Sequence, residues 1–196
     1  MLYSIVRGFL RFIFYFLGLK AEGLENLPKS GPFIIAANHV SNWDPIVVAL
    51  VLKRPVYFMG KKALFKYRIM AVICTALHAF PVKRGVPDRT AIRRALQVLE
   101  EGKVLGIFPE GARNTTGDMK ALPGVAMIAL KSGVPVVPVA CLGTRHTLPC
   151  GWIDPLQVRV GPPIYNSEIP EQGTKSARME RFSEEIMNKI NVLLHK

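Results

Sequence analysis

The chain has 196 residues, of which 49% are hydrophobic, and a formal net charge of +12. This length suits one well-buried domain and is too short for two. Its three cysteines, odd in number and without C-x-x-C spacing, argue against a disulfide framework and against a zinc site, so we predict no metal.

The first 19 residues are rich in large apolar side chains and carry two arginines one helical turn apart, Arg7 and Arg11. The uninterrupted apolar run that follows, 12–19, is far shorter than the roughly 20 residues that span a bilayer. No A-x-A-like cleavage site follows it, which argues against a removable signal peptide. We therefore predict a membrane-interface helix over 1–20, with both arginines toward phosphate headgroups and the aromatic face in the acyl region. The alternative is a core helix packed on the domain.

Beyond a turn-rich connector, the apolar run 33–37 is typical of a buried strand, and 45–52 is typical of a helix. His39 and Asp44 stand in the turn between them, where side chains can converge on a substrate without disturbing the core. A carboxylate beside an imidazole holds it in one tautomer as a general base, so the pair predicts deprotonation of a hydroxyl. The alternative is structural: Asp44 is the N-cap of the helix, and Pro45 is its first residue.

Basic residues dominate the next part of the chain. No acidic residue lies between Asp44 and Asp88. The cations in that interval are Lys53, Arg54, Lys61, Lys62, Lys66, Arg68, Lys83 and Arg84. Bulky apolar residues alternate with them and no nucleic-acid motif accompanies them, so a membrane surface or an acidic acyl donor fits better than nucleic acid. We predict a strand at 55–59 and one or two helices over 61–77.

The second half continues the alternation of strand and helix. Its predicted elements are a helix capped by Asp88, a strand at 104–107, a helix at 123–131, strands at 134–141 and 157–160, and a helix from about Lys175. Pro135 and Pro138 cannot donate ladder hydrogen bonds, so we expect their strand to be interrupted or at an edge. The alternation predicts a single α/β domain, with a mainly parallel or mixed sheet flanked by helices.

A second polar block, 108–114, follows the strand at 104–107. It places Glu110, Gly111 and Arg113 just past a strand end, the edge at which α/β sheets bind ligands. A glycine lets the backbone approach a ligand, and an arginine can grip a phosphate with two parallel hydrogen bonds. Together with the basic region described above, this block predicts a phosphate-bearing alcohol as substrate.

Four blocks of sequence occur in the order and spacing of the motifs of glycerolipid acyltransferases. They are N-H-x-S-x-x-D at 38–44, K-R-G at 83–85, F-P-E-G-x-R at 108–113 and V-P-V-V-P-V at 134–139. Within that family the chain most resembles the 1-acylglycerol-3-phosphate (lysophosphatidate) acyltransferases. The resemblance implies transfer of a fatty acyl group from a thioester, acyl-CoA or acyl carrier protein, to the free hydroxyl of the lysophospholipid, which forms phosphatidate. It implies no cofactor besides this co-substrate.

The resemblance also assigns roles within an acyltransferase domain over 21–196. His39 is then the general base, and Asp44 orients it and stabilises the imidazolium. Ser41 or backbone N–H groups support the thioester oxyanion. The residues expected to bind the acceptor are Lys83, Arg84, Glu110, Gly111 and Arg113.

Two other functions remain open from the sequence. One is acyl transfer to glycerol 3-phosphate or to another lysophospholipid, and the other is a non-catalytic, basic membrane-binding module. A serine hydrolase is disfavoured because the chain has no G-x-S-x-G motif. The expected location is the cytoplasmic face of the cell membrane, as a peripheral or monotopic protein on an anionic surface.

Overall fold

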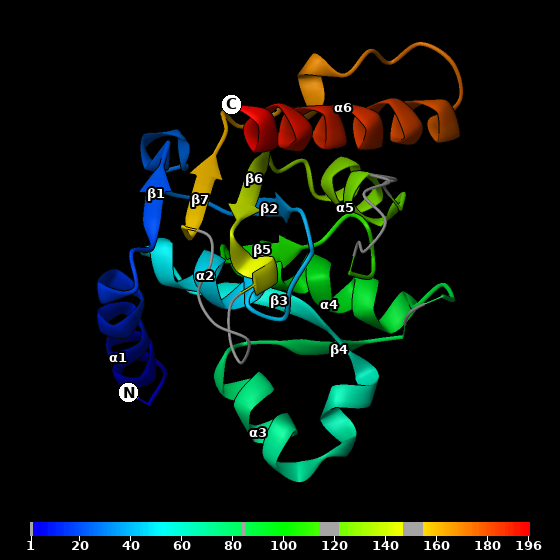
Figure 1. Cartoon of the computed structure of the whole chain (residues 1–196). Helices are drawn as coiled ribbons and strands as arrows, with labels where there is room; N and C mark the ends of the chain where they lie inside the picture. The colour runs from blue at the N-terminus through cyan, green and yellow to red at the C-terminus, as the bar shows by residue number, and fades with distance from the viewer. Residues whose placement is uncertain (1, 84, 114–121, 147–154) are drawn as a thin grey trace.

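Seven strands form one mixed sheet with helices on both faces (Figure 1). The computed structural model describes residues 2–83, 85–113, 122–146 and 155–196. The α-helices are α1 Leu2–Phe16, α2 Asp44–Val51, α3 Arg68–Ala76, α4 Arg89–Glu100, α5 Gly124–Ser132 and α6 Lys175–His195. The strands are β1 Lys20–Glu22, β2 Phe33–Ala37, β3 Val56–Lys61, β4 Phe80–Val82, β5 Val104–Ile107, β6 Val136–Leu142 and β7 Gln157–Val160. Short 3-10 turns are η1 Leu24–Asn26, η2 Lys62–Lys66, η3 Thr144–His146 and η4 Asn166–Glu168.

The strand order is β1-β7-β6-β2-β5-β3-β4, and all neighbours are parallel except β6 and β7, which are antiparallel. The five strands from β2 to β6 therefore end at the same edge of the sheet. Ligands of α/β sheets bind at this carboxyl edge. The prediction of one α/β domain with a mixed sheet is confirmed.

The central strand β2 is buried on both faces, as a strand covered by helices on both sides must be. Ile34 and Ala36 pack in the cluster formed with α4, α5 and α6. Phe33, Ile35 and Ala37 pack in the opposite cluster with α1 and α2. The uninterrupted apolar run of β2 is thus the consequence of a three-layer architecture.

The predicted helix after Asp88 and the predicted helix from about Lys175 are both confirmed, as α4 and α6. The side chain of Asp88 accepts hydrogen bonds from the N–H groups of Thr90 and Ala91, both at 3.1 Å, and so caps α4. The apolar stripe of α6 belongs to the core, where Phe182 and Ile186 are fully buried.

The prediction that the proline-containing strand is interrupted or at an edge is wrong. β6 is continuous and lies between β7 and β2. The carbonyl of Pro138 accepts from the N–H of Gly161 at 2.9 Å, just before the ladder of β6 with β7 begins at Val139 and Val160. The N–H and C=O of one strand residue point to the same side. The nitrogen of Pro138, which has no hydrogen to donate, therefore points toward the end of β7. The backbone hydrogen bonds between β6 and β2, on the other side of the strand, are not affected.

Helix α1 packs partly on the domain. Phe14 is 3% exposed and belongs to the core cluster that α2 completes. Arg7 donates from Nε to the carbonyl of Ala49 at 3.0 Å and from Nη2 to that of Leu52. The expectation that Arg7 points to headgroups is therefore wrong, because its guanidinium caps the C-terminal end of α2. None of the described helices is both long enough and apolar enough to cross a membrane.

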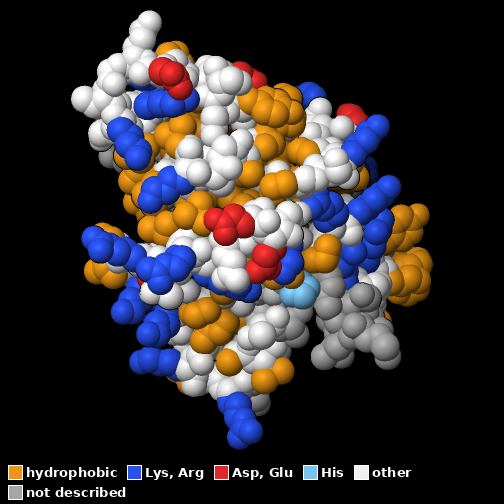
Figure 2. All heavy atoms as spheres, turned by 180° about the vertical axis from the view of Figure 1, so that it is seen from behind, with side chains coloured by type: hydrophobic (Ala, Val, Ile, Leu, Met, Phe, Trp, Pro, Cys, Tyr) orange, Lys and Arg blue, Asp and Glu red, His pale blue; other side chains and the backbone are white. Residues whose placement is uncertain are grey.

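Most cations of the basic region are exposed, and Figure 2 shows Lys and Arg side chains around the lower half of one face. Arg54 differs from them. It donates to the carbonyl of Gly102 at 2.7 Å and its guanidinium lies 5.4 Å from the ring centre of Phe33. This arginine holds the start of β3 to the loop before β5, so its charge serves the fold.

Candidate active site

The turn that follows β2 is fixed to the neighbouring strand β6. Asn38 is buried, and its amide nitrogen donates to the carbonyl of Cys141 at 3.0 Å. In return, the N–H of Cys141 donates to the amide oxygen of Asn38 at 2.7 Å. Through these two hydrogen bonds, the side-chain amide of Asn38 pairs with the backbone of β6 just beyond the end of β2. It sets the position of the next residue, His39, at the carboxyl edge.

His39 and Asp44 form a buried pair. Nδ1 of His39 lies 2.9 Å from Oδ2 of Asp44, and the two residues are 6% and 0% exposed. Because an ionised carboxylate can only accept hydrogen bonds, Nδ1 carries the proton in this pair. The lone pair of the neutral ring is then on Nε2. The arrangement can take up a proton at Nε2 and can stabilise the imidazolium that results.

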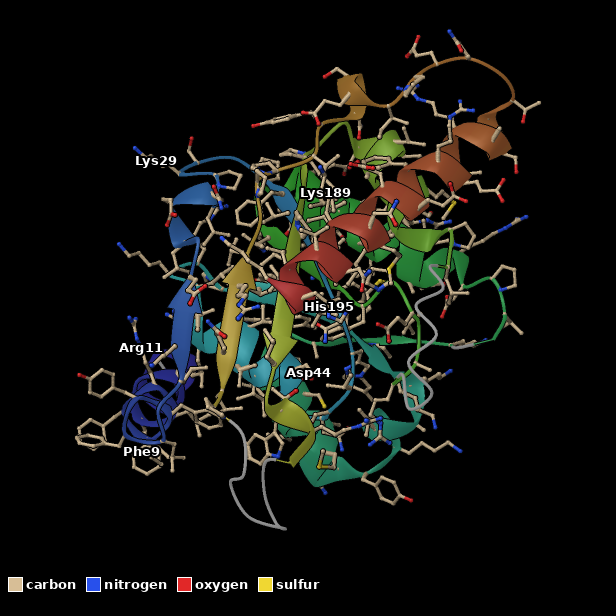
Figure 3. All side chains as sticks on the ribbon, turned by 45° about the horizontal axis from the view of Figure 1, so that its top comes forward. Phe9, Arg11, Lys29, Asp44, Lys189 and His195 are labelled. Atoms are coloured by element: carbon tan, nitrogen blue, oxygen red, sulfur yellow. The ribbon has the colours of Figure 1, made fainter. Side chains whose placement is uncertain are left out.

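The carboxylate of Asp44 is surrounded by donors. Its Oδ2 also accepts from the N–H groups of Val40 and Ser41, both at 2.7 Å. Its Oδ1 accepts from Oγ1 of Thr144 at 2.6 Å. Figure 3 shows Asp44 where the N-terminal end of α2 meets the end of β6. These bonds compensate for the burial of the charge and fix the carboxylate that orients His39.

The interpretation of Asp44 as the N-cap of a helix is wrong. The residue before it, Trp43, occupies the cap position, and Asp44 is the first residue of α2. Its side chain accepts from the N–H groups of the preceding turn rather than from those of the helix. The carboxylate is therefore directed back toward His39.

A stack of aromatic rings forms one wall of the site. The ring of Phe108 lies 4.1 Å from that of His39, with an angle of 21° between the planes. Phe58 continues the stack, at 5.7 Å from Phe108. These contacts restrict rotation of the imidazole and exclude water from one of its faces. Neither phenylalanine was predicted to have a role in the site.

Glu110 brings a second carboxyl group to the same edge. Its Oε1 lies 3.5 Å from the backbone nitrogen of His39, and its Oε2 is buried without a hydrogen-bond partner among the described residues. Burial raises the pKa of Glu110 to about 7; the hydrogen bond from His39 opposes this shift, and the charge of Asp44 adds to it.

Gly111 follows with φ +69°, and a Cβ there would lie 2.3 Å from Leu122. The positive φ favours glycine at this turn.

The buried carboxyl group of Glu110 should make stability depend on pH. Below about pH 4.5 it is protonated in both the folded and the unfolded chain. As the pH rises toward 7, the unfolded chain ionises while the folded chain stays neutral, so the wild type loses free energy of unfolding. Glu110→Gln should therefore gain stability relative to the wild type between these values and hold that gain above pH 7.

Urea unfolding of both proteins from pH 4 to 8 measures this difference. Glu100→Gln, on the exposed side of α4, is the matched control and should show no such rise. A difference between Glu110→Gln and the wild type that is independent of pH would mean that Glu110 ionises as readily in the folded as in the unfolded chain.

The predicted phosphate ligands are spread along the edge. Lys83 is exposed after β4, two strands beyond β5, and its N–H donates to Asp88 at 2.8 Å. Arg113 is exposed shortly after β5, the direct neighbour of β2. Arg84 lies outside the described residues. The structure thus places Glu110 beside the His39–Asp44 pair. Lys83 lies farther away, because β5 and β3 separate β4 from β2 and neighbouring strands are about 4.8 Å apart.

Ser41, the predicted support for an oxyanion, lies in the same turn. Its N–H donates to Asp44, and its hydroxyl accepts from the N–H of Trp43 at 3.3 Å. Its role toward an oxyanion stays a prediction. Among the described residues, no group of three or more His, Cys, Asp or Glu side chains is arranged to hold a metal ion.

Comparisons with known proteins bear on this arrangement. The acyltransferase family model matches residues 18–142. The 1-acyl-sn-glycerol-3-phosphate acyltransferase of Bacillus subtilis is 30% identical over 91% of this chain and 89% of its own. The chloroplastic enzyme of the same name from Arabidopsis thaliana is 33% identical over 71% of this chain and 40% of its own. The crystal structure of the 1-acyl-sn-glycerophosphate (LPA) acyltransferase PlsC from Thermotoga maritima is similar, with a TM-score of 0.65 and 30% identity over 91% of this chain and 73% of that one. The matched segment contains the His39–Asp44 pair and the Glu110 block, and the chain belongs to the acyltransferase family.

Proposed function

We propose that this protein transfers a fatty acyl group from a thioester to the free hydroxyl of 1-acylglycerol 3-phosphate, which forms phosphatidate. The observation that carries the proposal is the buried contact of 2.9 Å between His39 and Asp44 at the carboxyl edge of the sheet. The names of the relatives from Bacillus subtilis and Thermotoga maritima support this acceptor. A non-catalytic module has no need of a buried general base, which argues against the membrane-binding alternative.

In the proposed reaction, Nε2 of His39 removes the proton of the acceptor hydroxyl as its oxygen attacks the thioester carbonyl. Asp44, bonded to Nδ1, stabilises the imidazolium. When the tetrahedral intermediate collapses, the carbon–sulfur bond breaks and the imidazolium returns the proton to the leaving thiolate. An acyl-enzyme is not required, because the acceptor hydroxyl is itself the nucleophile.

The acceptor carries a phosphate, and Arg113 is an exposed cation on the connection that follows β5, a direct neighbour of β2. A charge-assisted hydrogen bond of this kind is worth about 1.5–3 kcal/mol. Arg113→Ala should therefore raise KM for lysophosphatidate by about 10- to 150-fold, with a smaller change in kcat. Arg93→Ala, which removes an exposed arginine of α4, is the control and should leave KM unchanged. An unchanged KM in Arg113→Ala would place the phosphate elsewhere.

The donor, acyl-CoA or acyl carrier protein, is anionic in either form, and the exposed cations of the basic region suit both. We place the reaction at an anionic membrane surface, where the acceptor lipid resides. Helix α1 supports this location because Phe9, Phe12 and Phe16 are 64–71% exposed on it.

The decisive experiment is acyl transfer by the purified protein in detergent or vesicles, with labelled lysophosphatidate and each thioester donor in turn. Formation of phosphatidate, lost in His39→Ala, supports the reaction class, the acceptor and the base together. Product only with glycerol 3-phosphate or another lysophospholipid keeps the reaction class and changes the acceptor. Vesicle binding without turnover of any acceptor would favour the membrane-binding module.

A further inference from the structure

The chain between β3 and β4 forms a separate lobe. It consists of η2 and α3, residues 62–76, and Figure 1 shows it projecting at the opposite end of the molecule from α6. The main contacts of α3 are with η2 rather than with the layers around the sheet. This lobe begins directly after Lys61, the last residue of β3, and therefore at the carboxyl edge where His39 lies.

Large apolar side chains of this lobe face solvent. Tyr67, which joins η2 to α3, is 70% exposed, and Val72 is 62% exposed. Leu64 and Met70 are 40% and 38% exposed. Single exposed apolar residues are ordinary, but several on one short projection are typical of an interaction surface.

The charge of the lobe is of one sign. Lys62, Lys66 and Arg68 are exposed among the apolar residues, and the sequence has no acidic residue between Asp44 and Asp88. In Figure 2, the lowest part of the molecule accordingly shows apolar and basic side chains without acidic ones. The opposite end, with α6, is mixed in charge: its glutamates are Glu168, Glu171, Glu180, Glu184 and Glu185.

An anionic bilayer satisfies both features of this surface. Tyrosine places its ring at the headgroup level and its hydroxyl in water, aliphatic side chains enter the acyl boundary, and lysine and arginine pair with lipid phosphates. The surface has several cations and no carboxylate. A protein partner would therefore need an acidic surface of its own to neutralise them. The exposed aromatic residues of α1, such as Phe9, which lies on the outer side of that helix in Figure 3, suit the same bilayer.

We propose that the η2–α3 lobe is a second membrane-docking element, which acts together with α1 on an anionic bilayer. With the lobe at the membrane, the carboxyl edge and His39 lie next to the lipid surface, and an acceptor lipid reaches the site without leaving the bilayer. This orientation rests on the proposed function. The docking itself is measured without turnover.

The test compares two double variants matched in residue type. Tyr67→Ser with Val72→Ser changes the lobe, whereas Tyr165→Ser with Val192→Ser changes exposed residues before η4 and on α6, where Val192 is 65% exposed. All four positions are at the surface, so folding should be retained. With vesicles of phosphatidylcholine and phosphatidylglycerol, the lobe variant should bind about tenfold more weakly or worse, and the control should bind like the wild type.

Charge is tested by Lys66→Gln against Lys189→Gln. Loss of one lysine near an anionic surface should weaken binding about fivefold at low salt, whereas Lys189, exposed on α6, should have no effect. High salt should reduce the difference. Phosphatidylcholine vesicles without anionic lipid should show no difference between these two variants.

Turnover then separates docking from chemistry. The lobe variant should lose activity on lysophosphatidate embedded in vesicles and keep activity on a short-chain lysophosphatidate dissolved as monomer. Equal vesicle binding by the two double variants would overturn the proposal, whether or not the protein is an active enzyme. A parallel loss on the soluble substrate would also overturn it, because the lobe would then act on the site itself.

Discussion

Replacement of His39 by alanine should lower kcat for acyl transfer by about 10²- to 10⁴-fold, the usual contribution of a positioned general base. The reason lies in the pairing with Asp44: Nδ1 is held by the carboxylate, so Nε2 is the ring atom left to accept a proton. The chain should stay folded, because Asp44 retains its bonds from Val40, Ser41 and Thr144. Steady-state kinetics with saturating acceptor and donor measure the loss.

His195→Ala is the matched control, since His195 is exposed at the end of α6 (Figure 3). It should leave kcat unchanged. Near-normal activity of purified His39→Ala would remove the general base from the mechanism. A rise in KM at constant kcat would instead make His39 a binding residue.

The pairing at the centre of the site could be predicted because it is local. His39 and Asp44 lie five positions apart in one strand-to-helix turn, so their spacing predicts a contact, and the family resemblance selects that contact over the N-cap alternative. Thr144, which bonds the other carboxylate oxygen, lies 100 positions away. No short motif marks it, and only the parallel register of β2 with β6 brings its strand end to Asp44. Contacts of this kind depend on tertiary structure.

The fold was likewise predictable where its causes lie in nearby residues and not where they lie in distant ones. Apolar runs and helix caps, such as Asp88, identify elements because their causes lie within a few residues. β1, with the sequence K-A-E, carries no such signal, and the predicted interface helix over 1–20 overlaps its first residue, yet it pairs with β7. The prediction that β6 is interrupted or at an edge was wrong. Whether a proline disrupts a sheet depends on which neighbouring strand its nitrogen faces, and the sequence does not show this. The raised pKa of Glu110 could not be predicted either, because the burial that causes it depends on tertiary packing.

Substitution of Asp44 should separate the structural from the chemical role of its carboxylate. In Asp44→Ala, the buried donors of Val40, Ser41 and Thr144 lose their acceptor, and removal of one partner of a buried pair typically costs about 3–5 kcal/mol. Denaturant unfolding should show this loss. Activity should disappear as well, because the ring of His39 is no longer oriented.

Asp44→Asn should fold but fail in chemistry. Its amide oxygen can take the place of Oδ2 and accept from His39, Val40 and Ser41, while its amide nitrogen donates to a Thr144 hydroxyl that has rotated to accept. The hydrogen bonds survive, but the negative charge that stabilises the imidazolium is gone, so kcat should fall by about 100-fold or more. Near-wild-type kcat in this variant would mean that Asp44 only orients the ring. A stability as low as that of Asp44→Ala would mean that the buried charge, rather than the acceptor geometry, holds the turn.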